Sequence, residues 1–172
     1  MKNFAVIALA LLAFTSCQKQ TKIGFVDNGV IINKYEEKLD LEKEFQKKED
    51  AFRKKFDSID ASFQTEVQDF QNNAGKMSQN SAQKKYQELG QKKQMQDQRK
   101  QMEAQNFRES FQAELDSIIQ KVRNYEKAYG ERHGYSFVLG TTDATSSVLY
   151  GDEQYDLTQT ILDSLNAAYK TN

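Results

Sequence analysis

Apolar residues recur at helical spacing through the middle of this chain of 172 residues. In the first half of the region, steps of three or four residues connect Phe52, Phe56, Ile59, Phe63, Val67, Phe70 and Ala74. In the second half, the same steps connect Phe107, Phe111, Leu115, Ile118, Val122, Tyr125 and Tyr129. Residues at this spacing share one face of a helix, and the positions between them are mostly polar. Each set therefore predicts one long amphipathic helix.

The two helices are expected to pair as an antiparallel hairpin. The sequence has no proline, and turn-forming residues inside this region cluster only between residues 72 and 78. Asn80 and Gln83 resemble a capping box that would begin the return helix. We predict an arm over residues 39–133 with its tip at about 71–81, roughly 50 to 60 Å long at 1.5 Å per residue. The apolar spacing, about 3.67 residues per step, keeps such a pair nearly straight.

The two ends of the chain predict short strands and helices. Residues 22–27 are typical of a strand, and Asn28 is placed to cap a short helix after it. The helical spacing ends at Gly134, and the alternation over residues 135–139 predicts a second strand. Residues 148–150 predict a third. A final helix should follow, capped by Asp156 and Gln159.

These elements predict an α+β fold, mostly α, in which the hairpin projects from a small body. The body combines residues 22–38 and 134–172. Its strands are few and its sheet edges would be exposed, so a body of this size gains little from burial alone. We therefore expect it to self-associate.

The amino terminus predicts export. Lys2 precedes an apolar stretch over residues 4–14, which makes residues 1–16 typical of a signal peptide. The chain's one cysteine, Cys17, follows directly. Its position resembles a bacterial lipobox, although Phe14 stands where an aliphatic residue is usual. We expect Cys17 to be lipidated and residues 17–21 to form a leader that anchors the protein to a membrane; the alternative is a free thiol.

Charge and motifs limit the chemistry. The net charge of −1 does not favour a nucleic-acid partner. Gly24 and Gly29 have the spacing of a phosphate-binding loop but lack its lysine, so no nucleotide is expected. His133 lies beside the glycine that ends the helix, where a capping role outweighs a metal or catalytic one. We expect no cofactor, no metal and no enzymatic activity.

The complete layout resembles the Skp/OmpH family of periplasmic chaperones. The resemblance rests on Lys22-Ile-Gly-Phe-Val-Asp27, the Gln/Lys-rich hairpin, and the segments 135–139, 148–150 and 156–158. It implies a homotrimer with a barrel-like β body, whose three hairpins enclose unfolded outer-membrane proteins without using ATP. It also implies contacts between subunits at the apolar strand positions, which are Ile23, Phe25, Val26, Tyr135, Phe137, Leu139, Val148 and Tyr150.

Client binding is expected on arm residues outside the apolar stripe, since flexible apolar side chains accept varied partners. The apolar candidates are Met77, Tyr86, Met95 and Met102. The basic candidates are Lys76, Lys84, Lys85, Lys92 and Lys93. They would draw in acidic clients or anionic headgroups, or else serve only as solvated charge. A different class of function, a structural envelope lipoprotein that acts as a spacer or docking module, is the alternative.

Overall fold

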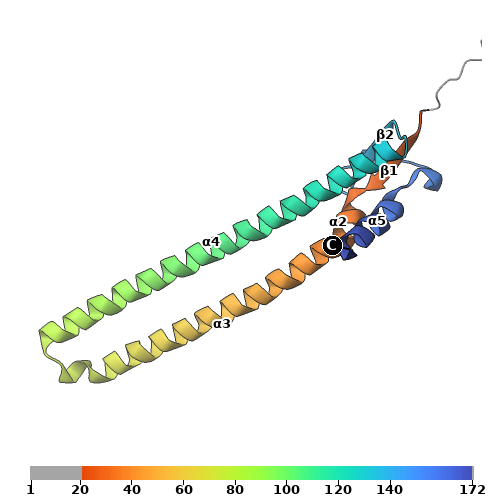
Figure 1. Cartoon of the computed structure of the whole chain (residues 1–172). Coiled ribbons are helices and arrows are strands. Elements are labelled where there is room, and N and C mark those ends of the chain that lie inside the picture. Colours follow the sequence, from red (N-terminus) through yellow and green to blue (C-terminus); the bar gives the residue numbers. More distant parts are fainter. Residues whose placement is uncertain (1–20, 172) are drawn as a thin grey trace, which may run out of the picture.

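The protein forms a long two-helix arm that is joined at one end to a small body (Figure 1). The structure, a computed structural model, describes residues 21–171. Cys17 and the expected signal peptide lie outside the described residues. The elements, in order, are β1 (Ile23–Asp27), α2 (Asn28–Lys34), α3 (Glu36–Asn73), the 3₁₀ turn η1 (Ala74–Lys76), α4 (Gln79–Arg132), β2 (Phe137–Thr141), the 3₁₀ turn η2 (Glu153–Tyr155) and α5 (Thr158–Lys170). The predicted class, mostly helical α+β, is confirmed.

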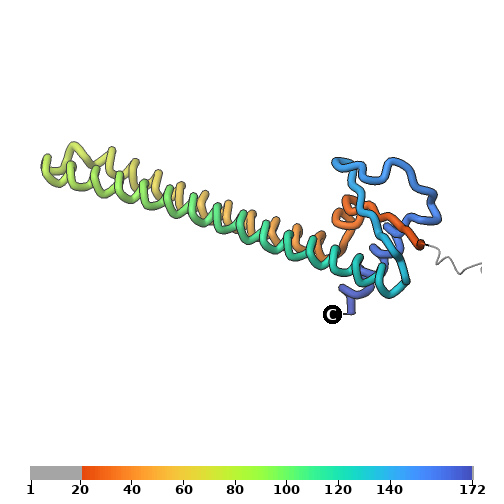
Figure 2. The backbone as a smooth tube through the Cα atoms, turned by 90° about the horizontal axis from the view of Figure 1, so that it is seen from above, coloured from red at the N-terminus to blue at the C-terminus, as the bar shows by residue number. Residues whose placement is uncertain are grey.

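The arm consists of α3 and α4, which run antiparallel and side by side (Figures 1 and 2). α3 has 38 residues and α4 has 54. At 1.5 Å per residue these lengths are about 57 and 81 Å. α4 is longer because it continues past the root of α3 into the body. The reversal occurs at η1, inside the range expected for the tip.

The return helix begins differently from the expectation. Ser78 is the N-cap of α4, and its hydroxyl accepts a hydrogen bond from the backbone N–H of Ser81 at 3.3 Å. Asn80 already lies in the first turn, so the proposed capping box of Asn80 and Gln83 is wrong. Ser78 has the extended backbone that an N-cap requires, because it is the residue at which the chain leaves the turn.

The far end of α4 is closed by Gly134, which has a φ of +69°. The N–H of Tyr135 donates to the carbonyl of Gly130 at 2.9 Å, and the N–H of Gly134 donates to the carbonyl of Glu131 at 3.3 Å. This pair of bonds is the Schellman arrangement, which needs a left-handed residue at the glycine position. The glycine terminator that the sequence suggested thus turns the chain into β2.

The sheet has two strands, β1 and β2, which pair in parallel with Ile23 opposite Phe137 and Phe25 opposite Leu139. A parallel pair needs a long connection between its strands, and here α2 and the whole arm supply it. The other edge of β1 is occupied by the segment before α5, where the N–H of Leu157 donates to the carbonyl of Phe25 at 2.8 Å. The predicted sheet from the two ends of the chain is therefore present.

The expected third strand at residues 148–150 is wrong for the single chain. These residues lie in the connection between β2 and η2. Both edges of β1 are already occupied by other segments of the chain, and residues 148–150 do not pair with the outer edge of β2. Residues 148–150 have the apolar residues typical of a strand, but in the single chain no strand pairs with them.

Two other caps also differ from expectation. Asp27, rather than Asn28, caps α2, and its Oδ1 accepts from the N–H of Val30 at 2.9 Å. Asp156 does serve the start of α5, where its Oδ1 accepts from the N–H of Thr158 at 2.8 Å. Gln159 instead bonds to Asp163 one turn along. In both places, an aspartate just before the helix accepts a hydrogen bond from a backbone amide of its first turn.

The core lies where the arm enters the body. α5 packs against α2, α3 and α4 there. Its Asn166 accepts a hydrogen bond from the N–H of Glu36 at 2.9 Å and so caps α3 from a distance in sequence. The buried cluster comprises Val26, Ile31, Tyr35, Leu41, Phe45, Ile118, Val122, Leu157, Ile161, Leu162 and Leu165. Both arm helices thus have their roots in the body.

Candidate functional site: the arm and the apolar edge of the body

The half of the arm nearest the body is held together by apolar side chains from both helices. Phe45 of α3 packs against Phe107 and Phe111 of α4, with ring centroids 5.2 and 5.1 Å apart. Ile118 and Val122 of α4 are buried beside them. The apolar stripes predicted from the sequence therefore do meet as a seam in this part of the arm.

The outer half of the arm is joined differently. Phe56 is only 2% exposed, but it lies beneath lysine side chains, with Nζ of Lys55 and Nζ of Lys100 at 5.2 and 5.5 Å from its ring centroid. The same lysines reach across to acidic residues on the opposite helix. Nζ of Lys55 is 2.6 Å from Oε2 of Glu103, and Nζ of Lys100 is 3.2 Å from Oδ2 of Asp60. In this part of the arm, ion pairs between the helices thus flank a few buried apolar side chains, Phe56 and Leu89 among them.

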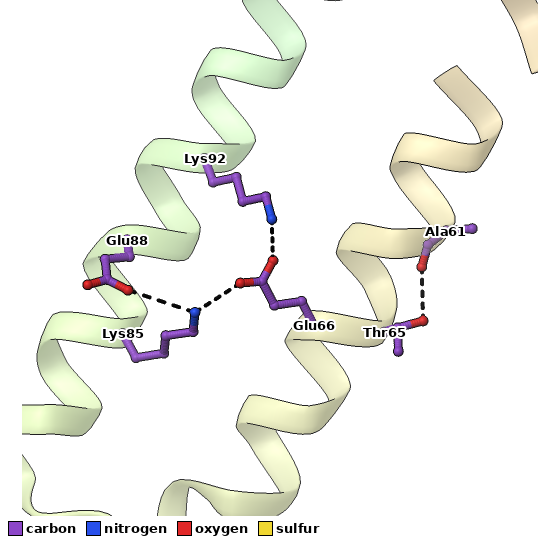
Figure 3. Close-up of polar contacts among 6 residues, drawn as sticks. All are labelled: Ala61, Thr65, Glu66, Lys85, Glu88 and Lys92. Atoms are coloured by element: carbon purple, nitrogen blue, oxygen red, sulfur yellow. Dashed lines mark hydrogen bonds and ion pairs between the residues drawn. The ribbon is translucent and has the colours of Figure 1, made fainter. Parts of the chain in front are cut away.

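The same pattern continues toward the tip. Glu66 of α3 points between Lys85 and Lys92 of α4, as Figure 3 shows, with N–O distances of 2.9 and 2.5 Å. Lys85 also approaches Glu88 at 3.8 Å. Hydrogen bonds from Lys92 and then from Lys85 lower the pKa of the Glu66 carboxyl, and the bond to Glu66 raises the pKa of Lys85. Both partners are therefore held in their charged forms.

These pairs change the set of basic candidates. Lys85 and Lys92 are engaged with Glu66, and Lys93 is 2.5 Å from Asp97, whose hydrogen bond raises the lysine's pKa. Lys76 and Lys84 are exposed and have no ion-pair partner within residues 21–171. The sequence could not reveal the Glu66 pairs, because they depend on how α3 and α4 are aligned. The free positive charge of the tip lies on Lys76 and Lys84.

The apolar candidates are all exposed, with values of 38% for Met77, 72% for Tyr86, 64% for Met95 and 59% for Met102. They do not form a single patch. A helix turns once every 3.6 residues, so Met95 and Met102, about two turns apart, share one face of α4. Tyr86 precedes Met95 by two and a half turns and lies on the opposite face. Met95 and Met102 are therefore the pair that one client segment can contact together.

A further surface was missed by the sequence reasoning. A hollow of about 570 Å³ lies beside Phe63 and Val67 of α3, with Asp60 and Lys93 on its borders. Both apolar side chains are half-buried. They were assigned to the seam, but the part of α4 between Leu89 and Phe107 has only methionines and alanine as apolar residues. The lack of large apolar residues in this part of α4 was the feature of the sequence that could have revealed the hollow.

The body has an apolar edge, which we define as Ile23, Phe25, Leu139, Val148 and Tyr150. These residues line a hollow of about 320 Å³ beside the sheet. Each was expected from the sequence at a subunit contact. Ile23, Leu139 and Tyr150 are 42%, 44% and 87% exposed.

The other expected contact residues differ in position. Phe137 is 58% exposed on β2, opposite Ile23 in the sheet. Tyr135 is half-buried and lies under the ammonium group of Lys22, at 4.0 Å from its ring centroid. Val26 is only 1% exposed and belongs to the chain's own core. Val26 therefore has little surface to offer a second subunit.

Within residues 21–171, no metal-binding group of side chains and no helix suited to span a bilayer is present. Residues 21–171 contain no group of histidine, cysteine, aspartate and glutamate arranged to hold a metal ion. None of the helices described between residues 21 and 171 has the length and apolar character that crossing a bilayer requires. His133 stacks on Tyr129 with ring centroids 4.1 Å apart at the end of α4. The candidate site therefore consists of two surfaces, the exposed face of the outer arm and the apolar edge of the body.

Comparisons with known proteins identify the family and support the fold. The model of a family described as outer membrane protein (OmpH-like) matches residues 22–165. A crystal structure of a protein from Caulobacter crescentus CB15 superposes on this chain with a TM-score of 0.77. That protein is provisionally named an OmpH-like outer membrane chaperone. The two chains are 10% identical, and the match covers 86% of this chain and 85% of the other. At this identity the superposition supports the fold alone. No match was found among curated proteins.

Proposed function

This chain belongs to the OmpH-like outer membrane protein family, a periplasmic and non-enzymatic chaperone family whose members bind unfolded outer membrane proteins, and from that premise we propose that it is an ATP-independent holdase. In this proposal three copies associate through their bodies. Their arms surround a space in which one unfolded outer-membrane protein is kept from aggregating. The premise is the family; the trimer, the enclosed client and the anchor are the proposal.

The observation that carries the proposal is the division of the chain into a rooted body and a projecting arm. The arm is a pair of helices of 38 and 54 residues whose outer half carries charged pairs and scattered apolar side chains. Such a wall offers a client many weak contacts and no single tight pocket. Multivalent contact then retains the client while each contact stays exchangeable, so release needs no nucleotide.

The apolar edge of the body supports self-association. A two-stranded sheet is marginal by itself, and the edge leaves large side chains in water on a body that is already small. A second copy placed against Ile23, Phe137 and Leu139 would cover these side chains. It would also give residues 148–150, which have a strand-like sequence without a partner, a strand to pair with.

The membrane anchor is a separate part of the proposal. Thr21 lines the hollow beside β1, and β1 lies at the end of the molecule away from the tip (Figure 1). If Cys17 is lipidated, only four residues separate the lipid from the body. The arms would then point away from the membrane that holds the anchor, and their open ends would face the aqueous space.

One experiment separates the holdase from a structural spacer or docking lipoprotein. The purified chain from Cys17 onward is mixed with a urea-denatured outer-membrane protein, the urea is diluted, and light scattering reports aggregation. The holdase predicts suppression that saturates at one trimer per client, whereas a spacer predicts none. A variant lacking about residues 60–100 should keep its assembly state and lose protection. Asp60 and Lys100 are in contact, so a short turn can close the arm there.

The anchor has its own test. Cells expressing the chain are labelled with radioactive palmitate, and a Cys17→Ala variant is the control. We expect incorporation into the first protein only. Incorporation into neither protein would remove the anchor from the proposal and leave the holdase function untouched.

A further inference from the structure

A cavity of about 370 Å³ lies at the root of the arm, where α4 meets β2 and the start of α2. Glu126 of α4 and Asn28 of α2 both line it. This cavity is separate from the client surfaces of the arm and from the hollow at the apolar edge, although Phe137 borders it. It lies between the elements that join the arm to the body.

Two acceptor oxygens at this cavity have no partner. Oε1 of Glu126 and Oδ1 of Asn28 are both buried, and neither accepts a hydrogen bond from any group in residues 21–171. Leaving a buried oxygen without a donor is costly, and two such atoms at one cavity are unusual. A single proton held by the carboxyl group would turn one of the two acceptors into a donor.

The charges around the Glu126 carboxyl group are compatible with a bound proton. The charged groups that line the cavity are Arg123, Lys127 and Glu131, all on α4, and Tyr135 is the only other titratable residue there. β1, α2 and β2 contribute Val26, Asn28, Phe137, Val138 and Gly140. Burial raises the pKa of Glu126 to about 7, against a smaller lowering by Arg123. The carboxyl group therefore lies in an environment that favours its neutral form.

We propose that Glu126 is a proton-binding group that, when protonated, donates to the amide oxygen of Asn28 and so fastens α4 to α2 at the root of the arm. Since the folded protein binds this proton more tightly than the unfolded chain does, the contribution to stability is present at acidic pH. It is lost as the pH rises through about 7, when a buried carboxylate without a partner is left behind. The arm is thus attached more firmly at acidic pH than at alkaline pH.

The test compares the pH dependence of unfolding in the full chain with that of two variants. Urea unfolding is followed between pH 5 and 8.5 for three proteins that all carry His133→Gln. They are the otherwise unmodified chain, Glu126→Gln and Glu131→Gln. Histidine is the other side-chain type that changes charge in this window, and this chain has one. Glu131 is the matched control, because it lines the same cavity from the same helix but is exposed.

We expect the unfolding equilibrium constant of the unmodified chain to rise severalfold per pH unit between about pH 5 and 7 on account of this group. Glu131→Gln should show the same slope. Glu126→Gln should be flat through the window and more stable than the unmodified chain at pH 8. Asn28→Ala should lower the midpoint of the Glu126 titration, because the acceptor of the proton is gone.

A direct titration keeps the proposal testable if Glu126→Gln fails to fold. Carbon-13 labelling of glutamate side chains allows the Glu126 carboxyl to be followed by NMR in the assembled protein. A titration midpoint above 6 supports the proposal. A midpoint below 5, or an unchanged slope in a folded Glu126→Gln variant, would overturn it and indicate that a donor from another subunit binds the carboxylate.

Discussion

Lys55 of α3 and Glu103 of α4 lie 48 positions apart in the sequence, yet their Nζ and Oε2 atoms are 2.6 Å apart across the arm. The pair marks the level at which the arm changes character. Between this pair and the body, the helices interlock through aromatic rings. Between this pair and the tip, they are joined mainly by lysines and carboxylates. An exposed ion pair opens to water without leaving a cavity, whereas interlocked rings do not. The outer arm is therefore the part that can separate most easily.

Glu66→Lys should separate the outer parts of the two helices. The substitution places a third positive charge between Lys85 and Lys92 and removes the acceptor of both. Amide hydrogen exchange is expected to speed up in α3 near residues 62–73 and in α4 near residues 79–92, while the body keeps its protection. Exchange measured by mass spectrometry on peptides from both regions checks this.

A charge swap is the matched control for Glu66→Lys. In the triple variant Glu66→Lys, Lys85→Glu and Lys92→Glu, the same three positions carry opposite charges in the same arrangement. The amide exchange rates of the triple variant should be close to those of the unmodified chain. Equal exchange in the single and triple variants would mean that the ion pairs do not hold the tip together.

Acid should open the outer arm before it affects the body. Hydrogen bonds from lysine lower the pKa of Glu66, and bonds from Lys55 and then Arg99 lower the pKa of Glu103. A carboxyl group with a lowered pKa stabilises the fold above its ordinary value and loses that contribution as the pH falls through the folded value. The loss should therefore begin below about pH 4.3, the ordinary value for glutamate. Spin labels at Gln64 and Gln91, in a Cys17→Ala background, would report the widening as a longer mean distance.

Acid is expected to destabilise the outer arm, whereas protonation of Glu126 is proposed to stabilise the root of the arm. The two effects of pH are therefore opposite. A chain whose outer arm and root both loosened at pH 4 would contradict one of the two assignments. Distance measurements at the outer arm and unfolding measurements of the body can be made on the same samples, so the two effects can be told apart.

Much of the fold could be predicted because the sequence is locally consistent. Steps of three and four residues defined the two long helices, and Gly134 marked where the helical period ended. Positions that depend on a choice among neighbours were less secure. Asp27 and Asn28 are both good caps, as are Ser78 and Asn80, and only the path of the backbone decides which one lies at the helix end.

The candidate site was harder to predict, since it depends on contacts between distant segments. The five lysines were treated as one basic patch, but the alignment of the two helices gives two of them to Glu66. The apolar stripe of α3 was treated as one seam, but α4 offers no matching stripe beside Phe63. Residues 148–150 have the pattern of a strand, and a pattern cannot say whether the partner strand lies in the same chain.

Phe137→Asp should weaken the assembly of the bodies while leaving the single chain folded. Phe137 is 58% exposed, so the new carboxylate remains in water in an isolated chain. Phe137 pairs with Ile23 of the apolar edge in the sheet. In an assembly that covers both residues, the same carboxylate would be buried without a partner, at a cost of about 2 kcal/mol or more per contact. Sedimentation velocity should show a shift toward monomer, with unchanged helical content by circular dichroism.

Leu149→Asp is the control for assembly. Leu149 is 92% exposed and, unlike Val148 and Tyr150, does not line the hollow at the apolar edge. In the strand that we propose for residues 148–150, its side chain points to the face opposite theirs, away from the neighbouring body. Its variant should sediment like the unmodified chain. Should both variants dissociate equally, the subunit contact would have to include Leu149, and the apolar edge as defined here would be too narrow.

Met95→Gln combined with Met102→Gln should weaken client binding without changing the assembly. The two side chains share one exposed face of α4, and glutamine has a similar length and helix propensity but a polar end. If a client covers part of each methionine, the loss is about 1 kcal/mol per residue, or roughly fivefold in Kd for each. Fluorescence titration of a labelled, unfolded outer-membrane protein measures the change. Gln98→Ala with Gln101→Ala, two exposed changes between the methionines, is the matched control and should leave Kd unaltered. An unchanged Kd in the methionine variant would move the client surface to the hollow beside Phe63 and Val67, where Phe63→Ser is the next variant to measure.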